Sequence, residues 1–196
     1  MPPIPAEQMT PQQREAVAEI ASSRRGGLIG PFVPALRSPE LMRRLQSLGD
    51  YLRFDNAVGR KLTEMTILLT ARAWRQDFEW HVHAPLARQS GLAPAIVDAI
   101  AANRRPERMS EDEAIVYDLF NELQQTHALG DATYARAVQA FGEPGVIDLV
   151  SAIGYYSTLA MIMNVARTPS PPGPWLTEPG TKDQGPAAKG QGQPQA

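Results

Sequence analysis

The sequence of 196 residues contains no cysteine. Disulfides, thiolate metal ligands and every mechanism that needs a nucleophilic or redox-active thiol are therefore excluded. An excess of positive charge is missing as well, because 19 lysines and arginines face 21 acidic residues and the net charge is -2. Since proteins that bind nucleic acids gather basic residues on one face, we expect no nucleic-acid partner.

Strand-like patterns are also missing. Between Thr10 and Arg167 the apolar residues follow helical spacing nearly throughout, and no stretch shows the sustained alternation of a half-buried strand. The sequence therefore predicts an all-α fold. Residues 1–12 are polar and rich in proline, where a signal peptide would carry a cationic segment and an apolar run, so we expect cytoplasmic residence.

The length and the 43% content of hydrophobic residues fit one globular domain with a substantial core. We predict an N-terminal helix and loop over residues 1–30, a helical domain over 31–167 and a disordered tail over 168–196. The tail alternates Pro, Gly, Gln, Lys and Ala and has almost nothing apolar beyond Trp175 and Leu176. These two residues could attach its first part to the body or to a neighbouring subunit.

The predicted first helix opens at Thr10 and Pro11, since proline is favoured in the first helical turn. A capping box of Ser110 and Glu113, which we interpret as structural, opens a later one. Pro85 should kink the helix that contains it. After the first helix, the expected ranges are 38–54, 58–74, 76–89, 94–103, 110–127, 131–141 and 144–166.

Residues 26–34 are too rich in glycine and proline to be helical. Such an apolar loop either lids a pocket or merely covers the core, and the sequence leaves both alternatives open.

The last predicted helix carries no charge between Asp148 and Arg167. Its length would suit a membrane span, but Gly154, Tyr155, Tyr156 and neighbouring polar residues make a poor lipid face, so we expect a core or subunit-interface helix and no membrane partner. Of the two tyrosines, one should pack and the other could lend its hydroxyl to a pocket.

The chemistry is expected on the helix predicted at 76–89. Glu79 and His83 are four residues apart, so they share a face and can touch, whereas His81 points away. The only sensible metal-ligand set would be these two residues with Glu64, but the Glu-x-x-His repeat of di-iron proteins is absent. Nucleophile-elbow, phosphate-loop and dinucleotide motifs are absent too, so we expect neither metal nor cofactor.

Several residues carry a resemblance to the carboxymuconolactone decarboxylase family and its alkylhydroperoxidase D-like branch, over roughly residues 31–168. They are the run from Glu64 through Trp74, Glu79 with Trp80, His83, and Gly91 with Leu92. The peroxidase branch has Cys-x-x-Cys-x-x-x-His with a glutamate twelve residues before the first cysteine. The corresponding residues in this chain are Gln76, Glu79, His83 and Glu64, so both thiols are replaced.

The resemblance implies an all-helical subunit that assembles into trimers or hexamers, with active sites at or near subunit contacts. It also implies a cofactor-free lyase, such as a decarboxylase, or an isomerase that acts on a small carboxylated or lactone-type metabolite. His83 would be the acid or base, Glu79 would orient it, and Glu64 would complete a relay or act as the alternative base. A thiol peroxidase is excluded because it needs both cysteines.

Alternatives to this assignment stay open. The protein could be a non-catalytic oligomeric scaffold or ligand-binding protein in which Glu79 and His83 form a buried structural pair. Glu64 could simply pair with Arg60 or Lys61, one turn earlier.

The expected substrate-binding residues are Trp80 and Phe78, as a pocket wall, and Arg75, as the partner of a substrate carboxylate. For the aromatic residues, core packing is the competing interpretation. For the cation, Arg72 and Arg88 also lie nearby in sequence, and the sequence does not decide among the three arginines.

Overall fold

The computed structural model describes residues 1–170 and Leu176, and within them every regular element is helical. This confirms the all-α prediction. Most of the tail predicted to be disordered, including Trp175, lies outside the described residues. The elements are η1 (Ala6–Gln8), α1 (Pro11–Ser22), α2 (Phe32–Ala35), α3 (Pro39–Asp50), η2 (Tyr51–Asp55), α4 (Arg60–Ala73), α5 (Asp77–Gln89), α6 (Pro94–Ala101), α7 (Glu111–Thr126) and α8 (Asp131–Ala166).

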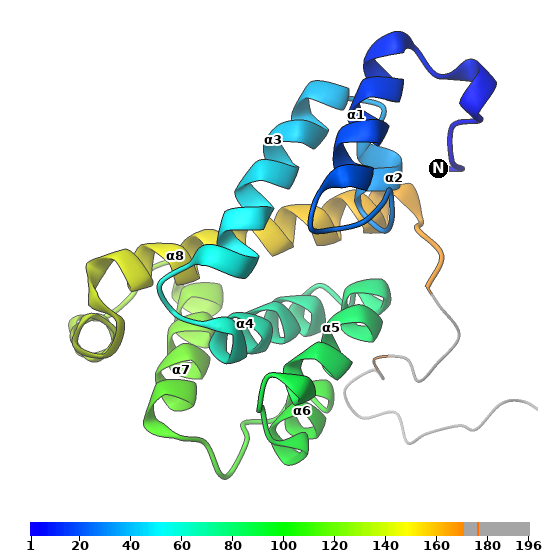
Figure 1. The fold of residues 1–196 in the computed structure, drawn as a ribbon. Coiled ribbons are helices and arrows are strands. Elements are labelled where there is room, and N and C mark those ends of the chain that lie inside the picture. The colour runs from blue at the N-terminus through cyan, green and yellow to red at the C-terminus, as the bar shows by residue number, and fades with distance from the viewer. Residues whose placement is uncertain (171–175, 177–196) are drawn as a thin grey trace, which may run out of the picture.

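The long helix α8 crosses the middle of the molecule, with α1 to α3 on one side and α4 to α7 on the other (Figure 1). Helix α4 packs against α5, α6, α7 and α8 and is buried from Leu62 to Arg72. The main apolar core lies around it and includes residues such as Met65, Leu68 and Leu119. A side chain on α4 is therefore held on all sides, which suits a precisely positioned polar group.

Helices α1, α2 and α3 form a second apolar cluster. Ala16 and Ile20 of α1 pack with Phe32 and Leu36 around α2 and with Met42 of α3. The capping box of Thr10 and Gln13 fixes the start of α1, as the sequence predicts. This N-terminal cluster joins residues from both sides of position 30, and the domain limits given above remain predictions.

Helix α8 consists of two straight parts. Gly142 interrupts it with φ 68° and ψ 168°, and Pro144 follows at the start of the second part. The predicted separation into 131–141 and 144–166 is thus confirmed. By length and composition α8 could span a membrane, but 56% of its most apolar window is buried inside the fold, as in core helices of soluble proteins.

One local prediction needs correction. The segment 26–34 was expected to be free of helix, yet the short helix α2 begins at Phe32. Its Pro34 occupies the first turn, where a missing N–H leaves no helical hydrogen bond unmade. Pro85, which was expected to kink its helix, lies inside α5 and is exposed to solvent, and the kink remains a prediction.

Candidate active site

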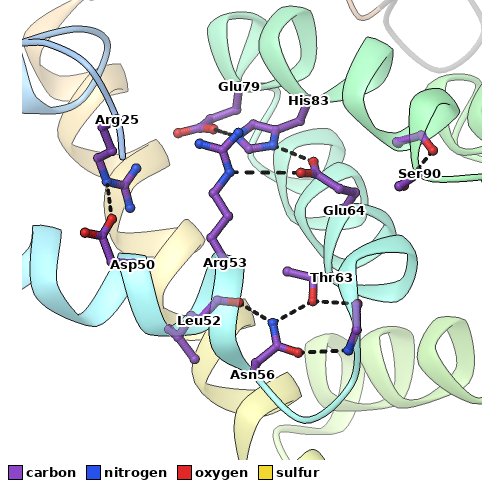
Figure 2. A network of polar contacts seen from close by, with 12 residues as sticks. Arg25, Asp50, Leu52, Arg53, Asn56, Thr63, Glu64, Glu79, His83 and Ser90 are labelled. Carbon is purple, nitrogen blue, oxygen red and sulfur yellow. Dashed lines mark hydrogen bonds and ion pairs between the residues drawn. The ribbon is translucent and has the colours of Figure 1, made fainter. Parts of the chain in front are cut away.

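Helices α4 and α5 bring three buried polar side chains together. Glu64, in the middle of α4, is 1% exposed, and Glu79 and His83 on α5 are each 4% exposed. His83 Nδ1 lies 2.7 Å from Glu64 Oε2, and His83 Nε2 lies 3.2 Å from Glu79 Oε2. Figure 2 shows the imidazole ring between the two carboxylates. The predicted contact between Glu79 and His83 is confirmed, and we call these three residues the His83 network.

The start of α5 positions this network. The side chain of Gln76 caps the helix by accepting a hydrogen bond from the N–H of Phe78 at 2.9 Å. Its amide nitrogen donates to Asn164 Oδ1 of α8 at 2.8 Å, which ties the start of α5 to α8. Glu79 follows in the first turn, where the helix dipole favours a negative charge. At the two positions that hold thiols in the peroxidase motif, Gln76 thus caps and tethers α5, and Glu79 is hydrogen-bonded to His83.

The pKa of His83 is raised above its ordinary value. Burial lowers it, but the hydrogen bonds and charges of Glu64 and Glu79 together outweigh this effect. The two carboxylates therefore favour the protonated ring, which donates from both nitrogens, one to each carboxylate. A bridging imidazolium also explains how two carboxylates can be buried so close to each other.

A small cavity of about 50 Å³ opens beside the network. Since a water molecule takes up about 30 Å³ in the liquid, it has room for one or two small groups. Glu79 and His83 line it, whereas Glu64 lies behind the ring of His83 and does not. The other lining residues are Arg25, Arg53 and Tyr156, which are polar, and Ile29, Pro31, Phe32, Phe78, Val82 and Leu159, which are apolar.

The glycine-rich loop before α2 forms one wall of this cavity. Ile29, Pro31 and Phe32 line it, while Phe32 also belongs to the N-terminal cluster. Gly30 adopts φ +55°, and a side chain there would overlap the ring of Phe78. The sequence left open whether this loop lids a pocket or covers the core. In the structure it lines the cavity and also packs on core residues.

The aromatic residues predicted as a pocket wall have different positions. Phe78 lines the cavity, but Trp80 is 9% exposed and packs in the main core. Tyr156 is a cavity residue, and its ring meets the ring of His83 edge-on with centroids 5.5 Å apart. Its neighbour Tyr155 packs in the adjacent small cluster with Leu159. One tyrosine hydroxyl near the pocket was anticipated, and the structure assigns that place to Tyr156.

None of the arginines considered from the sequence reaches the cavity. Arg75 is exposed in the turn between α4 and α5, where its φ of 50° directs the chain into the new helix. Arg88 is 3.1 Å from Asp98, and Arg72 lines a different cavity beside α7. The arginines at the site are Arg25, which precedes the loop, and Arg53 of η2. No periodic pattern relates these positions to α5, so sequence spacing gave no signal for them.

The alternative for Glu64, an ion pair with Arg60 or Lys61, does not occur in the structure. Lys61 Nζ instead lies 2.7 Å from Glu113, on the side of α7. The nearest guanidinium to Glu64 is that of Arg53, with 4.0 Å between Nε and Oε1.

Among residues 1–170 and Leu176, no group of three or more His, Asp or Glu side chains is arranged to hold a metal ion. Both nitrogens of His83 already face carboxylates, which leaves no lone pair for a metal while the ring is protonated.

Comparison with known proteins gives the family context. Residues 39–112, which contain the whole His83 network, match the model of the Carboxymuconolactone decarboxylase family. The chain is thus similar to this family over that segment. The match ends before most of α7 and begins after Arg25, so the N-terminal side of the cavity is contributed by residues outside it. A comparison with functionally curated proteins gives no match.

Two solved structures share the fold. One is an uncharacterized peroxidase-related protein from Ralstonia eutropha JMP134, described as having an alkylhydroperoxidase AhpD core. It has a TM-score of 0.67 and 15% identity over 84% of this chain and 88% of that chain. The other is a protein of unknown function from Agrobacterium tumefaciens, described as a candidate antioxidant defence protein AhpD. Its TM-score is 0.62 and its identity 18%, over 71% of this chain and 96% of that chain.

Proposed function

We propose that this protein is a cofactor-free lyase or isomerase that moves protons on a small carboxylated or lactone-type metabolite. The observation that carries the proposal is the placement of His83 between two carboxylates. Of these three residues, Glu79 and His83 face the cavity and Glu64 does not. The similarity of residues 39–112 to the decarboxylase family supports the reaction class. A two-thiol peroxidase reaction needs cysteines at positions that are Gln76 and Glu79 here.

The geometry divides the work among the three residues. Glu64 accepts the shorter hydrogen bond, holds the ring of His83 and stabilises its positive charge. Glu79 contacts the second ring nitrogen, Nε2 of His83, and also lines the cavity. A proton can therefore pass between Glu79 and His83. This changes the roles expected from sequence, because Glu64 is the orienting group and Glu79 is a proton carrier at the cavity.

In a decarboxylation, the bond between the substrate carbon and its carboxylate breaks, and carbon dioxide leaves. The electron pair stays on the carbon and is delocalised into a conjugated carbonyl of the substrate. His83 then donates its Nε2 proton to that carbon and regains a proton from water. In an isomerisation, Glu79 removes a proton from one carbon and the pair returns a proton at another. Such positioned proton transfer accelerates reactions by about 10² to 10⁴.

The direct test is a screen of carboxylated lactones and enolisable carboxylates for carbon dioxide release and for deuterium incorporation from heavy water. Glu79→Gln should abolish turnover of any active compound, while His81→Gln, on the exposed side of the same helix, should leave it unchanged. Undiminished turnover by Glu79→Gln would disprove the proton-transfer assignment.

A non-catalytic ligand-binding or scaffold protein is the second candidate. The small volume of the cavity and the nearly complete burial of the three polar residues favour it. If the screen finds ligands that shift the melting temperature but none that is converted, this candidate replaces the enzyme.

We further propose that the protein is a cytoplasmic homo-oligomer, a trimer or a hexamer. The outer side of α8 supports self-association, because Ile147, Met161 and Val165 are exposed there. No charged residue lies between Asp148 and Arg167, so two copies of this face could meet without like-charge repulsion. Light scattering coupled to gel filtration should give a mass of three or six chains, and a monomer at micromolar concentration would refute the proposal.

A further inference from the structure

Unpaired buried hydrogen-bond donors gather around the cavity beside His83. Within the described residues, the Nε of Arg53 and the hydroxyl of Tyr156 are buried without a hydrogen-bond partner, and both residues line this cavity. The Nε of Arg25, a third lining residue, has no hydrogen bond either, but it faces Asp50 Oδ1 at 3.3 Å as an ion pair. A buried donor without an acceptor is costly, and native proteins seldom keep one without a reason. Because guanidinium nitrogens can only donate and a tyrosine hydroxyl is able to, an acceptor would satisfy all of these groups.

Arg25 is held rigidly at the cavity. Its Nε lies 3.3 Å from Asp50 Oδ1, its Nη2 donates to the hydroxyl of Tyr155 at 3.3 Å, and its guanidinium stacks 4.8 Å from the ring centroid of Phe32. Its side chain is only 9% exposed. A side chain at Gly49 would overlap both Arg25 and Tyr155, so glycine at this position leaves room for the arginine.

Arg53 comes from the opposite side. It lies in the π-helical turn η2, an element that is rare and frequent at functional sites. Figure 2 shows its guanidinium directed toward Glu64, Glu79 and His83. Its distance of 4.0 Å from Glu64 is too long for a hydrogen bond, and its side chain is 17% exposed.

The charges that reach the cavity wall are unequal. Three cations line it, namely Arg25, Arg53 and protonated His83, but Glu79 is the only carboxylate among the lining residues. Asp50 and Glu64 lie behind Arg25 and His83 and do not line the cavity. Asp50 and Glu64 nevertheless offset the charges of Arg25 and His83 at 3.3 and 2.7 Å. Arg53, whose nearest ion-pair contact is 4.0 Å long, is therefore the least compensated cation at the wall. A bound anion would face its planar guanidinium, which suits a carboxylate.

We propose that Arg25, Arg53 and Tyr156 form a subsite for one carboxylate group, with the tyrosine hydroxyl donating a hydrogen bond to an oxygen of the same ligand. This inference rests on the proposed function, for which it specifies the substrate class as a small monocarboxylate. The cavity volume of about 50 Å³ fits such a group, and the rest of the ligand extends toward Ile29, which is 55% exposed at the mouth. Burial raises the pKa of Tyr156 well above its ordinary value, so its hydroxyl stays a donor.

The test is a titration of the full chain with acetate, followed by NMR chemical shifts, against acetamide as a neutral molecule of the same shape and sodium chloride at equal ionic strength. Acetate should bind and acetamide and chloride should not. Arg53→Gln should weaken acetate binding about 10-fold or more, and Tyr156→Phe less, because hydrogen bonds to charged groups are the stronger ones. Arg44→Gln, which removes an exposed guanidinium paired with Glu40, is the matched control and should bind as the wild type does.

Equal binding of acetate and acetamide, or unchanged acetate affinity in Arg53→Gln, would overturn the subsite. Arg25→Gln removes a partner of Asp50 and could unfold the protein, so the conclusion is drawn from Arg53→Gln and Tyr156→Phe, with helicity checked by circular dichroism. Glu79→Gln separates the two proposals. It should lose turnover yet keep or tighten acetate binding, since it removes a negative charge from the cavity wall. If Glu79→Gln keeps both its turnover and its acetate binding, the proton-transfer proposal fails while the carboxylate subsite stands.

Discussion

Helix α4 takes part in two polar contacts with neighbouring helices, and they differ in kind. On one side Lys61 meets Glu113 of α7, and on the other Glu64 meets His83 of α5. Glu113 also accepts a hydrogen bond from the N–H of Ser110 at 2.8 Å within a capping box. This Glu113 network contains no buried side-chain atom without a partner, whereas the His83 network adjoins a cavity whose residues leave donors unpaired.

The pKa shifts separate the two networks further. In the Glu113 network burial raises the pKa of the carboxyl group, but the hydrogen bonds from Lys61 and Ser110 lower it more, so the charged form is stabilised. In the His83 network the pKa of the imidazole is raised. Both shifts stabilise an ionised side chain, but only that of His83 brings a transferable proton close to the physiological range beside an open space. The difference indicates that buried charge alone does not mark a site, whereas charge next to unsatisfied donors and a cavity does.

The largest expected effect is on turnover. Glu79→Gln keeps the size and polarity of the side chain but removes its capacity to carry a proton, so kcat should fall by about 10² to 10⁴. The matched change in the other network, Glu113→Gln, should leave kcat within about twofold, because Glu113 serves folding. Steady-state kinetics on the substrate found in the screen measures both. Equal losses in the two variants would show that the His83 network has no special role.

The next effect is on stability. His83→Ala leaves the carboxylates of Glu64 and Glu79 buried without their shared cation, and removing one partner of a buried ion pair lowers the free energy of unfolding by about 3 to 5 kcal/mol. Urea denaturation followed by circular dichroism measures this loss. His81→Ala, on the exposed side of α5, is the control and should change stability by less than about 0.5 kcal/mol. A stable His83→Ala variant would imply that water or a proton replaces the imidazolium with little loss.

A smaller loss is expected in the Glu113 network. Glu113→Ala removes half of the capping box and the partner of Lys61, whose side chain is 35% exposed. Caps contribute about 0.5 to 2 kcal/mol, and partly exposed ion pairs add little. The free energy of unfolding should therefore fall by about 1 to 2 kcal/mol, less than for His83→Ala. A loss of unfolding free energy larger than that of His83→Ala would show that the Glu113 network contributes more to stability than the His83 network, against this prediction.

The sequence supports some of these features better than others. The contact of Glu79 with His83 follows from one helical turn, and the capping box at Ser110 and the break at Gly142 are local signals that the structure confirms. Glu64 could be placed only through the family resemblance, because a residue 19 positions from His83 carries no local signal.

Arg25 and Arg53 were not predicted from the sequence, because they too carry no local signal and no motif includes them. They reach the cavity through the packing of the N-terminal cluster and through a π-helical turn, and neither is encoded by residue spacing. The cation expected from the sequence was Arg75, with Arg72 and Arg88 as the alternatives nearby in the chain. Yet the position of Arg75 in the turn before α5 leaves it exposed and away from the cavity.

The smallest effect, and the one that most directly compares the networks, is the dependence of stability on pH. His83 has a raised pKa in the folded state, so its stabilisation is fully present below the unfolded value of about 6.5 and is lost as pH rises through the folded value. Glu113 has a lowered pKa, so its stabilisation is present above the unfolded value and is lost as pH falls. Asp118 and Glu122 also have lowered pKa values and contribute to the same acid limb.

Urea denaturation at intervals from pH 3 to pH 9, below the range in which tyrosines titrate, should therefore show two limbs. The alkaline limb should fall by at most about 1.4 kcal/mol per pH unit, the slope of a single proton, and should flatten in His83→Gln but not in His81→Gln. The acid limb should become shallower in Glu113→Gln and keep its shape in His81→Gln. If the alkaline limb persists in His83→Gln, then the imidazole is not the group whose proton the fold retains, and the assignment of His83 as the protonated centre of the site is wrong.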